Sequence, residues 1–388
     1  MSAKDRDKSF DAIVVGAGVI GLACAWRAAQ AGVRPLVLDR SDPPRGATQV
    51  AAGMLAPVGE LQFREEALLE MTLASAAAFP DFVAELESAT GLPTGYVRSG
   101  ALHVALDGDE AAELRRRYEL QRSRGLEAEW LSPRACRRLE PGLAPSFHGG
   151  VHVPGEAAVD PRALCAALSS AIEAAGGELR NGVDVAGLLL DAETVRGVRM
   201  ADGSEALAPS VVVATGAWSG IAAWLPAEAR PPVRPVKGQI LELRGAAADP
   251  VCERIVASER VYLVPRPDGR LVVGATVEER GFDVEVTAGG VHELLREAYR
   301  LLPDVAELEL SKASAGLRPG TPDNLPLIGP GAFDGLLLAT GHFRNGVLLA
   351  PLTGDAIARL LAGDEPPAPV SAADPHRLDA VEAVGVAR

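Results

Sequence analysis

A strand, a glycine turn and a helix at the start of the chain constrain its fold more than any other feature. Residues 12–15 form an apolar run, and Gly16, Gly18 and Gly21 follow it in a GxGxxG pattern. In this pattern the first glycine permits a tight turn, the second lets the backbone approach a pyrophosphate, and the third lets the helix pack against the strands. The N-terminus of such a helix favours negative charge. The pattern therefore predicts a unit that binds an adenine dinucleotide.

A carboxylate completes this unit at the end of a second apolar strand. Residues 36–38 are apolar, and Asp39 follows them. A carboxylate at this place accepts hydrogen bonds from the adenosine ribose and disfavours the 2′-phosphate of NADP. It does not separate FAD from NAD. A purely structural glycine turn is the alternative, and the complete strand–turn–helix–strand order disfavours it.

The length and the charge of the chain narrow its class. With 388 residues the chain is too long for one ordinary core, so we expect two domains. The formal net charge of −14 disfavours nucleic acid and anionic membrane surfaces as partners. No apolar window approaches the length of a membrane span, and the charged N-terminus does not resemble a signal peptide.

The cysteines indicate neither a metal site nor a disulfide framework. Cys24, Cys136, Cys165 and Cys252 form no CxxC pair, and none lies near a histidine at metal-ligand spacing. We therefore expect reduced thiols, no metal and a cytoplasmic location.

Hydrophobic periodicity predicts the remaining helices and strands. Helices are expected over residues 65–89 with an interruption at Pro80, 109–125, 161–175 and 291–302, and a last helix capped by Asn345 and Gly346 and ending at 361. Apolar strands at 211–217 and 335–340 resemble the first strand, so we expect all three in one parallel sheet. Shorter strands at 239–243, 261–265 and 271–275 lie outside this set.

Several motifs in a fixed order carry a resemblance to a known family. They are the N-terminal glycine turn, AAGMLAP (51–57), ATGAW (214–218), PVKGQ (235–239), YLVPR (262–266), GLRPGTPDNLPLIG (316–329) and GHFRNGVLLAP (341–351). Together they resemble the D-amino-acid oxidase superfamily of FAD-dependent oxidoreductases, and most closely its glycine oxidase branch, which serves thiamin biosynthesis. Asp39 stands where that superfamily more usually has Glu, and Phe343 where it often has Tyr.

The resemblance implies an α/β fold with two parts. One is an FAD-binding, Rossmann-like domain of the glutathione-reductase type, and the other is a mostly antiparallel α+β substrate domain. We expect residues 1–90, 150–225 and 318–388 in the FAD-binding domain, and residues 91–149 and 226–317 in the substrate-binding domain. The cofactor is expected to be noncovalent FAD, because no cysteine follows Cys252 to tether it.

Four residues are expected to form the catalytic end of the site. A guanidinium pairs with a carboxylate through two hydrogen bonds, which suits Arg318 to hold the substrate, and the resemblance implies that it binds the α-carboxylate. It also implies that Tyr262 donates to the same carboxylate and that Met54 restricts the pocket to small side chains. Arg344 is expected to contact the substrate or the flavin edge. Structural roles are the alternatives for Tyr262, Met54 and Arg344.

A larger set of residues is expected to contact FAD. It consists of Gly16, Gly18, Gly21, Asp39, Arg40, Thr48, Gln49, Ala52, Gly53, Met54, Val185, Gly216, His342, Arg344, Asn345, Gly346, Val347 and Leu348. Lys237 is a candidate for activating oxygen electrostatically, with a solvated lysine as the alternative. No general base is assigned, because hydride transfer from a neutral amine requires none and the cofactor supplies the redox chemistry.

The resulting expectation is an FAD-dependent amine oxidase. It would oxidise glycine, sarcosine or D-alanine to the imine and reduce O2 to hydrogen peroxide, for thiamin thiazole synthesis. The resemblance also implies a homo-oligomer. One alternative is a dehydrogenase of the same fold that acts on D-amino acids or proline and passes electrons to quinone. A second is a flavin-binding protein without turnover.

Overall fold

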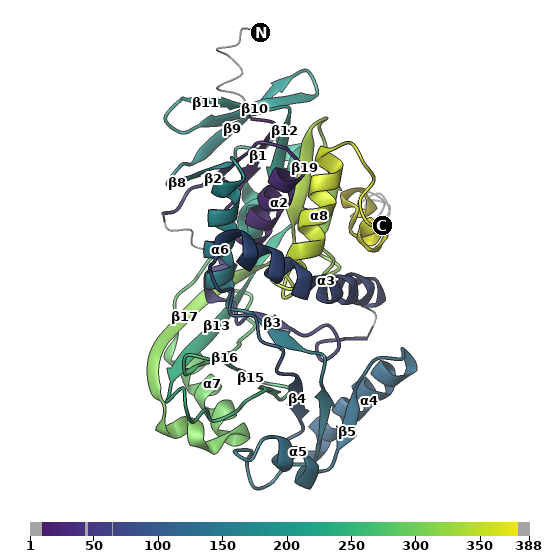
Figure 1. The fold of residues 1–388 in the computed structure, drawn as a ribbon, viewed down its shortest axis with the longest axis vertical. Helices are drawn as coiled ribbons and strands as arrows, with labels where there is room; N and C mark the ends of the chain where they lie inside the picture. Colours follow the sequence, from purple (N-terminus) through teal and green to yellow (C-terminus); the bar gives the residue numbers. More distant parts are fainter. Residues whose placement is uncertain (1–9, 43–45, 64, 379–388) are drawn as a thin grey trace.

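The fold is taken from a computed structural model that describes residues 10–42, 46–63 and 65–378. Two large sheets dominate it. The upper part of Figure 1 holds the N-terminal strands and the last helix, and the lower part holds the strands and helices from the middle of the chain. This arrangement confirms the expected α/β class with a second, mostly antiparallel part.

A six-stranded, mostly parallel sheet forms the upper part. Its order is β18 (Leu327–Pro330), β19 (Leu336–Thr340), β12 (Ser210–Val213), β1 (Ala12–Val15), β2 (Pro35–Asp39) and β8 (Glu178–Asn181). Val14 pairs with Val212 on one side and with Val37 on the other, both in parallel. Strand β12 also pairs in parallel with β19, which confirms that the three apolar strands share one parallel sheet.

A three-stranded antiparallel sheet lies beside it. Its order is β11 (Glu205–Leu207), β10 (Thr194–Met200) and β9 (Val185–Asp191). The Asp202-Gly203 turn joins β10 to β11, and Gly203 adopts the left-handed φ of 84° that such a turn needs.

An eight-stranded, mostly antiparallel sheet forms the lower part. Its order is β17 (Glu309–Gly320), β13 (Arg234–Arg244), β16 (Arg270–Gly274), β15 (Tyr262–Pro265), β14 (Ile255–Ala257), β4 (Ala101–Val104), β6 (Gly150–Val153) and β5 (Glu129–Leu131). A short pair, β3 (Met54–Leu55) and β7 (Ala157–Ala158), lies between the two parts. Strand β6 belongs to this sheet although residues from 150 on were expected in the FAD-binding domain, and β17 crosses the expected boundary at 317. The domain division itself stays a prediction.

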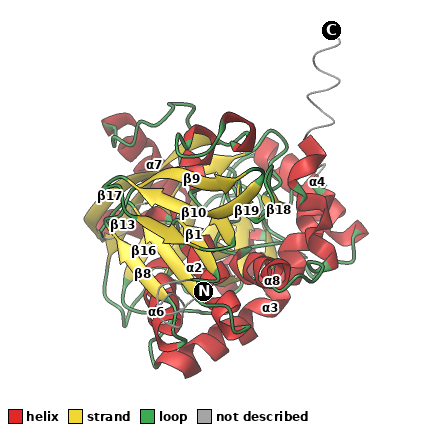
Figure 2. Cartoon of the chain, turned by 90° about the horizontal axis from the view of Figure 1, so that it is seen from above, coloured by secondary structure: helices red, strands yellow, loops and turns green. Residues whose placement is uncertain are grey.

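Helices flank both sheets. They are α2 (Val19–Gln30), α3 (Glu66–Thr90), α4 (Gly108–Ser123), α5 (Pro133–Leu139), α6 (Pro161–Ala174), α7 (Ala288–Leu301) and α8 (Ala350–Leu361). Short 3₁₀ helices are η1 (Ala47–Val50), η2 (Gly216–Ile221), η3 (Ala227–Ala229), η4 (Pro303–Glu307), η5 (Ala368–Ala373) and η6 (Pro375–Leu378). Seen from above, α3, α6 and α8 gather on one side of the strands and α7 lies on the other (Figure 2).

Two helix boundaries differ from the expectation. Helix α3 continues through Pro80 without the expected interruption. Helix α8 begins at Ala350, not directly after the expected Asn345-Gly346 cap, because residues 346–349 form separate turns in which the Leu349 N–H donates to the Asn345 carbonyl. The chain therefore winds once before the regular helix starts.

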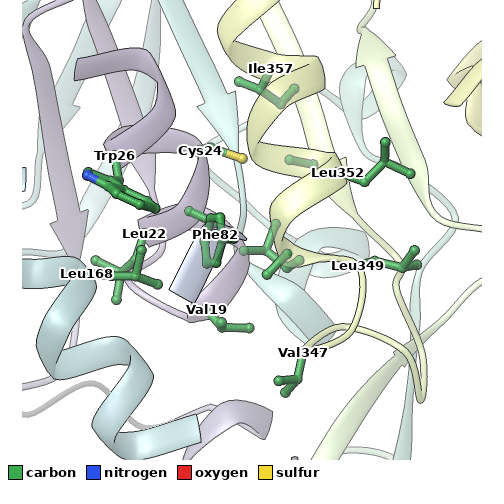
Figure 3. Close-up of a cluster of buried hydrophobic side chains, with 14 of the residues drawn as sticks. Val19, Leu22, Cys24, Trp26, Phe82, Leu168, Val347, Leu349, Leu352 and Ile357 are labelled. Carbon is green, nitrogen blue, oxygen red and sulfur yellow. The ribbon is translucent and has the colours of Figure 1, made fainter. Parts of the chain in front are cut away.

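The largest apolar core lies where α2, α3, α6 and α8 meet the six-stranded sheet. Trp26 of α2 packs edge-on against Phe82 of α3, with ring centroids 5.0 Å apart, and Leu168, Leu352 and Ile357 belong to the same apolar cluster (Figure 3). Small residues bring α2 and α8 together: a Cβ on Gly354 would lie 2.8 Å from the Ala23 carbonyl oxygen. Burial of this apolar surface is the main force that holds the helices on the sheet.

Helix α3 corrects the expectation about membrane spans. By length and composition alone this helix is long and apolar enough to cross a membrane. A core helix of a water-soluble protein passes the same test, and the buried face of α3, with Met71, Phe79 and Phe82, belongs to the core described above. We therefore take α3 as a core helix.

Replacing Phe82 by Ala should destabilise the fold strongly. The side chain is fully buried, and truncation of a buried Phe costs about 3–5 kcal/mol through lost burial and a residual cavity. The measurement is thermal unfolding followed by circular dichroism. The matched control is Phe63→Ala, because Phe63 is 48% exposed and its truncation should leave the midpoint nearly unchanged. Equal midpoints for both variants would contradict the core assignment.

Candidate functional site

One long cavity joins the two parts of the molecule. Its volume is about 830 Å³, and its lining runs from the glycine turn after β1 to the side chains of β15, β13 and β17. At the upper end the lining residues follow the carboxyl ends of parallel strands, namely Gly16 after β1, Asp39 at the end of β2, Gly216 after β12 and His342 after β19. This is where α/β sheets bind their ligands.

The glycines of the β1–α2 turn are required by close backbone contacts. Gly16 has a φ of 115°, and a Cβ there would lie 2.4 Å from the Ala214 carbonyl oxygen. A Cβ on Gly21 would lie 1.9 Å from the Gly16 carbonyl oxygen. Gly21 therefore lets α2 pack onto the turn, as expected, and it is not among the residues that line the cavity.

The N-terminus of α2 is open to an anion. Its first residue is capped by Gly18, which offers no side chain, and the first turn holds no acidic residue. The Val19 N–H donates to Thr48 Oγ1 at 3.2 Å, which brings η1 and its Thr48 and Gln49 against this helix end. Free N–H groups and the helix dipole at this point fit the pyrophosphate of a dinucleotide.

Asp39 fixes the turn from the neighbouring strand. Its two carboxylate oxygens accept the N–H of Ala17 at 2.8 Å and the N–H of Ser41 at 2.9 Å. A carboxylate oxygen accepts more than one hydrogen bond, so both retain capacity for a ribose hydroxyl. Next to it the Arg40 guanidinium lies 4.5 Å from the centroid of the Trp218 ring, and Val185 also lines the cavity. These residues fit an adenosine.

Arg318 and Tyr262 lie together at the other end of the cavity. Arg318 is on β17 beside β13, and its Nη1 donates to the carbonyls of Thr276 at 3.1 Å and Lys237 at 3.5 Å. Burial raises the pKa of the Tyr262 phenol, and the nearby Arg318 acts in the opposite direction, so the phenol is a donor at neutral pH. A guanidinium and a phenol O–H beside each other suit a carboxylate.

Two glycines make room for these side chains, and the sequence reasoning missed both. A Cβ on Gly238 would lie 2.4 Å from Arg318 Nη1, and a Cβ on Gly274 would lie 2.4 Å from the Tyr262 hydroxyl. Each glycine lies on the strand next to the one that carries its partner side chain. In the sequence, Gly238 is the G of PVKGQ, and Gly274 lies at the end of a short apolar run. Neither has the positive φ that would demand glycine for the backbone.

The chain around β3 forms a third wall. Met54 is partly buried, packs near Tyr262 and lines the cavity together with Ala52 and Gly53. Glu60 lies in the turn that follows β3 and also lines the cavity, and the sequence reasoning missed it. Burial raises the pKa of the Glu60 carboxyl, while Arg344 and Arg318 lower it. The sequence signal that could have indicated Glu60 is an acidic residue three positions after the AAGMLAP motif.

The segment after β19 supplies the last wall. Arg344 lines the cavity, where it was expected to contact the substrate or the flavin edge, and its guanidinium forms an ion pair with Glu65. His342 is buried, its Nε2 lies 3.0 Å from Thr353 Oγ1, and burial lowers its pKa to about 3, so it is neutral. Gly346 and Val347 also line the cavity.

Three further sequence candidates lie away from the cavity lining. Asn345 is buried and its N–H donates to the His342 carbonyl, whereas Leu348 packs in the apolar core. Lys237 is neither solvated nor on the lining, because its side chain is fully buried and its Nζ lies 2.7 Å from Asp283. The Lys237 side chain is therefore held by Asp283 and does not contribute to the cavity wall.

The cysteines and possible metal ligands agree with a cofactor held by noncovalent contacts. Cys24, Cys136, Cys165 and Cys252 are free and buried, and none lines the cavity. Burial raises the pKa of Cys136 to about 11 and that of Cys165 to about 12, so these thiols are unreactive. Within residues 10–42, 46–63 and 65–378, no cluster of three or more His, Cys, Asp or Glu side chains suits a metal ion.

Comparison with known proteins identifies relatives of the whole fold. Residues 11–360 match the family model of FAD-dependent oxidoreductases. The chain is 36% identical to a glycine oxidase of Geobacillus kaustophilus over 92% of this chain and 94% of that protein. The crystal structure of glycine oxidase from that organism superposes with a TM-score of 0.87 and 34% identity over 95% of this chain and 98% of the other.

A second group of relatives is longer. The chain is 38% identical to the bifunctional protein ThiO/ThiG of Trichormus variabilis, over 90% of this chain and 52% of that protein. The chain therefore spans about half the length of these bifunctional relatives.

Replacing Gly238 by Ala should displace Arg318 without unfolding the chain. The added methyl would meet the end of a flexible guanidinium, while the backbone conformation suits Ala. We expect weaker binding of a carboxylate ligand by about tenfold, the range of one lost charge-assisted hydrogen bond, with FAD content unchanged. The measurement is an acetate titration followed by flavin absorbance. Gly289→Ala is the control, because open space surrounds Gly289, and tight acetate binding by Gly238→Ala would refute the steric argument.

Proposed function

Because the chain belongs to the family of FAD-dependent oxidoreductases, we propose that it is an amine oxidase that acts on glycine and other small amines. The products are the imine and hydrogen peroxide, with O2 as the oxidant. The observation that carries this proposal is the pairing of Arg318 with Tyr262 at the end of the cavity opposite the dinucleotide site. Sarcosine and D-alanine are the further substrates that we expect.

Arg318 and Tyr262 determine how the substrate lies. The guanidinium and the phenol O–H bind the α-carboxylate, which fixes one end of the molecule and orients its Cα–H. Gly238 and Gly274 allow this placement, since any larger residue would fill the space of the two binding groups. Met54 of β3 packs near Tyr262 and limits the room for a side chain on Cα.

FAD, when bound, supplies the redox chemistry by accepting a hydride from Cα and passing two electrons to O2. Gly16, Gly18, Asp39 and Thr48 would hold its adenosine diphosphate half, and those residues of 342–347 that line the cavity would lie at its flavin half. Neutral His342 adds no charge at that wall, because burial lowers its pKa to about 3. We assign no general base to the chain.

Location, assembly and pathway belong to the same proposal. The relatives named ThiO/ThiG and glycine oxidase support a role in thiamin thiazole synthesis. The reduced, buried cysteines support a cytoplasmic location. We also propose noncovalent FAD and a homo-oligomer formed by this chain.

Replacing Arg318 by Ala should raise the KM for glycine by about 10- to 100-fold, because a charge-assisted pair to the carboxylate is lost. The measurement is oxygen uptake with peroxide formation, together with anaerobic flavin bleaching by glycine, sarcosine and D-alanine. Lys312→Gln is the matched control, because Lys312 is an exposed cation on the same strand.

The outcomes separate the alternatives. An unchanged KM in Arg318→Ala would remove the carboxylate assignment. Flavin that no small amine bleaches would overturn the proposed oxidase activity in favour of a protein without turnover. Bleaching without oxygen consumption, and turnover only with a quinone or dye, would favour a dehydrogenase of the same fold.

A further inference from the structure

A buried cation lies directly behind the carboxylate-binding end of the cavity. Lys237 of β13 is 0% exposed, and its ammonium donates to Asp283 Oδ2 at 2.7 Å. The neighbouring Gly238 lines the cavity and Lys237 does not, as the alternation of a strand requires. A charge with no exposure needs a partner, so this ion pair is a fixed contact and not a solvated surface pair.

Asp283 belongs to the connection between β16 and α7, residues 275–287, which we call the β16–α7 segment. The segment extends alongside β13: the Lys237 N–H donates to the Glu278 carbonyl and the Glu278 N–H donates to the Lys237 carbonyl, both at 2.9 Å. The Lys237–Asp283 pair then joins the middle of the segment to the same strand.

A second buried side chain of β13 holds both ends of the segment. Gln239 Nε2 donates to Glu278 Oε1 at 2.7 Å and to Thr287 Oγ1 at 3.2 Å, and its Oε1 accepts the Thr287 N–H at 2.9 Å. Thr276 Oγ1 donates to the same Glu278 oxygen at 2.6 Å. The segment is therefore attached at its start, middle and end to residues 237 and 239.

The segment in turn supports Arg318. The carbonyl of Thr276, in its first residues, accepts from Arg318 Nη1 at 3.1 Å, and the carbonyl of Lys237 lies 3.5 Å from the same atom. The Lys237 carbonyl belongs to β13, and the Thr276 carbonyl belongs to the β16–α7 segment. The Lys237–Asp283 pair holds this segment against that strand. A shift of the segment would move the Thr276 carbonyl and with it the guanidinium.

We propose that Lys237 and Asp283 are positioning residues that hold Arg318 in its carboxylate-binding orientation through the Thr276 carbonyl. The inference rests on the proposed function, in which Arg318 binds the substrate carboxylate. It gives Lys237 a role in substrate binding, in place of the expected role toward oxygen. Neither residue touches the substrate.

The test uses Asp283→Asn in the FAD-loaded enzyme, because Asp283 is 40% exposed and its replacement should leave the fold intact. We expect the KM for glycine and the dissociation constant of acetate, which has no amino group to oxidise, each to rise about tenfold. The kcat should change less than twofold and the FAD content not at all. Asp283→Glu, which keeps the carboxylate, should restore values near those of the parent enzyme. Lys237→Met should behave as Asp283→Asn does.

The control is Glu279→Gln, which removes the exposed ion pair between the same segment and Arg234 of β13. It should leave both constants unchanged. The acetate titration, read from flavin absorbance, needs no turnover and separates two failures. If Arg318→Ala weakens acetate binding and Asp283→Asn does not, the positioning role is overturned and the proposed function stands. If Arg318→Ala itself leaves acetate binding unchanged, the proposed carboxylate site is wrong.

Discussion

The close approach of three backbone segments at the β1–α2 turn is the constraint on which the site depends. The Gly16 carbonyl lies where a Cβ on Gly21 would be, and Gly16 itself lies against the Ala214 carbonyl. Helix α2 can therefore begin directly at the end of β1, with its N-terminus open beside β12. Parallel pairing of β1 with β12 and of β12 with β19 then brings Gly216 and His342 to the same edge.

The end of the cavity that holds Arg318 and Tyr262 is formed by side chains and not by a backbone turn. There the side chains of antiparallel strands define the chemistry, and the space for each comes from a glycine on the next strand. Arg318 occupies the place that a side chain on Gly238 would take, and Tyr262 that of one on Gly274. Because these strands belong to another sheet than the β1–α2 turn, the groups that select the substrate are separate from those that fit the dinucleotide.

Local signals predicted much of this from the sequence. The glycine turn, Asp39 and the apolar strands carry their own periodicity and spacing, and the structure places them as expected. The sequence did not predict that α3 continues through Pro80 or that α8 begins at Ala350, because packing against α2 and the core decides both. Glu60 and Lys237 were missed or misplaced for the same reason: what surrounds them comes from distant segments.

Lys237 illustrates why residue type and a family resemblance are insufficient to assign a role. A lysine on a strand near a flavin site suggests an electrostatic role toward oxygen, but strand alternation turns its side chain away from the cavity and into contact with Asp283. The same alternation turns Gly238 toward the cavity. Two consecutive residues of β13 therefore affect Arg318 in different ways. Gly238 leaves space for the guanidinium, and Lys237 holds the segment whose Thr276 carbonyl accepts a hydrogen bond from it. The orientation of the guanidinium is consequently a property of the sheet and its attached segment, and not of Arg318 alone.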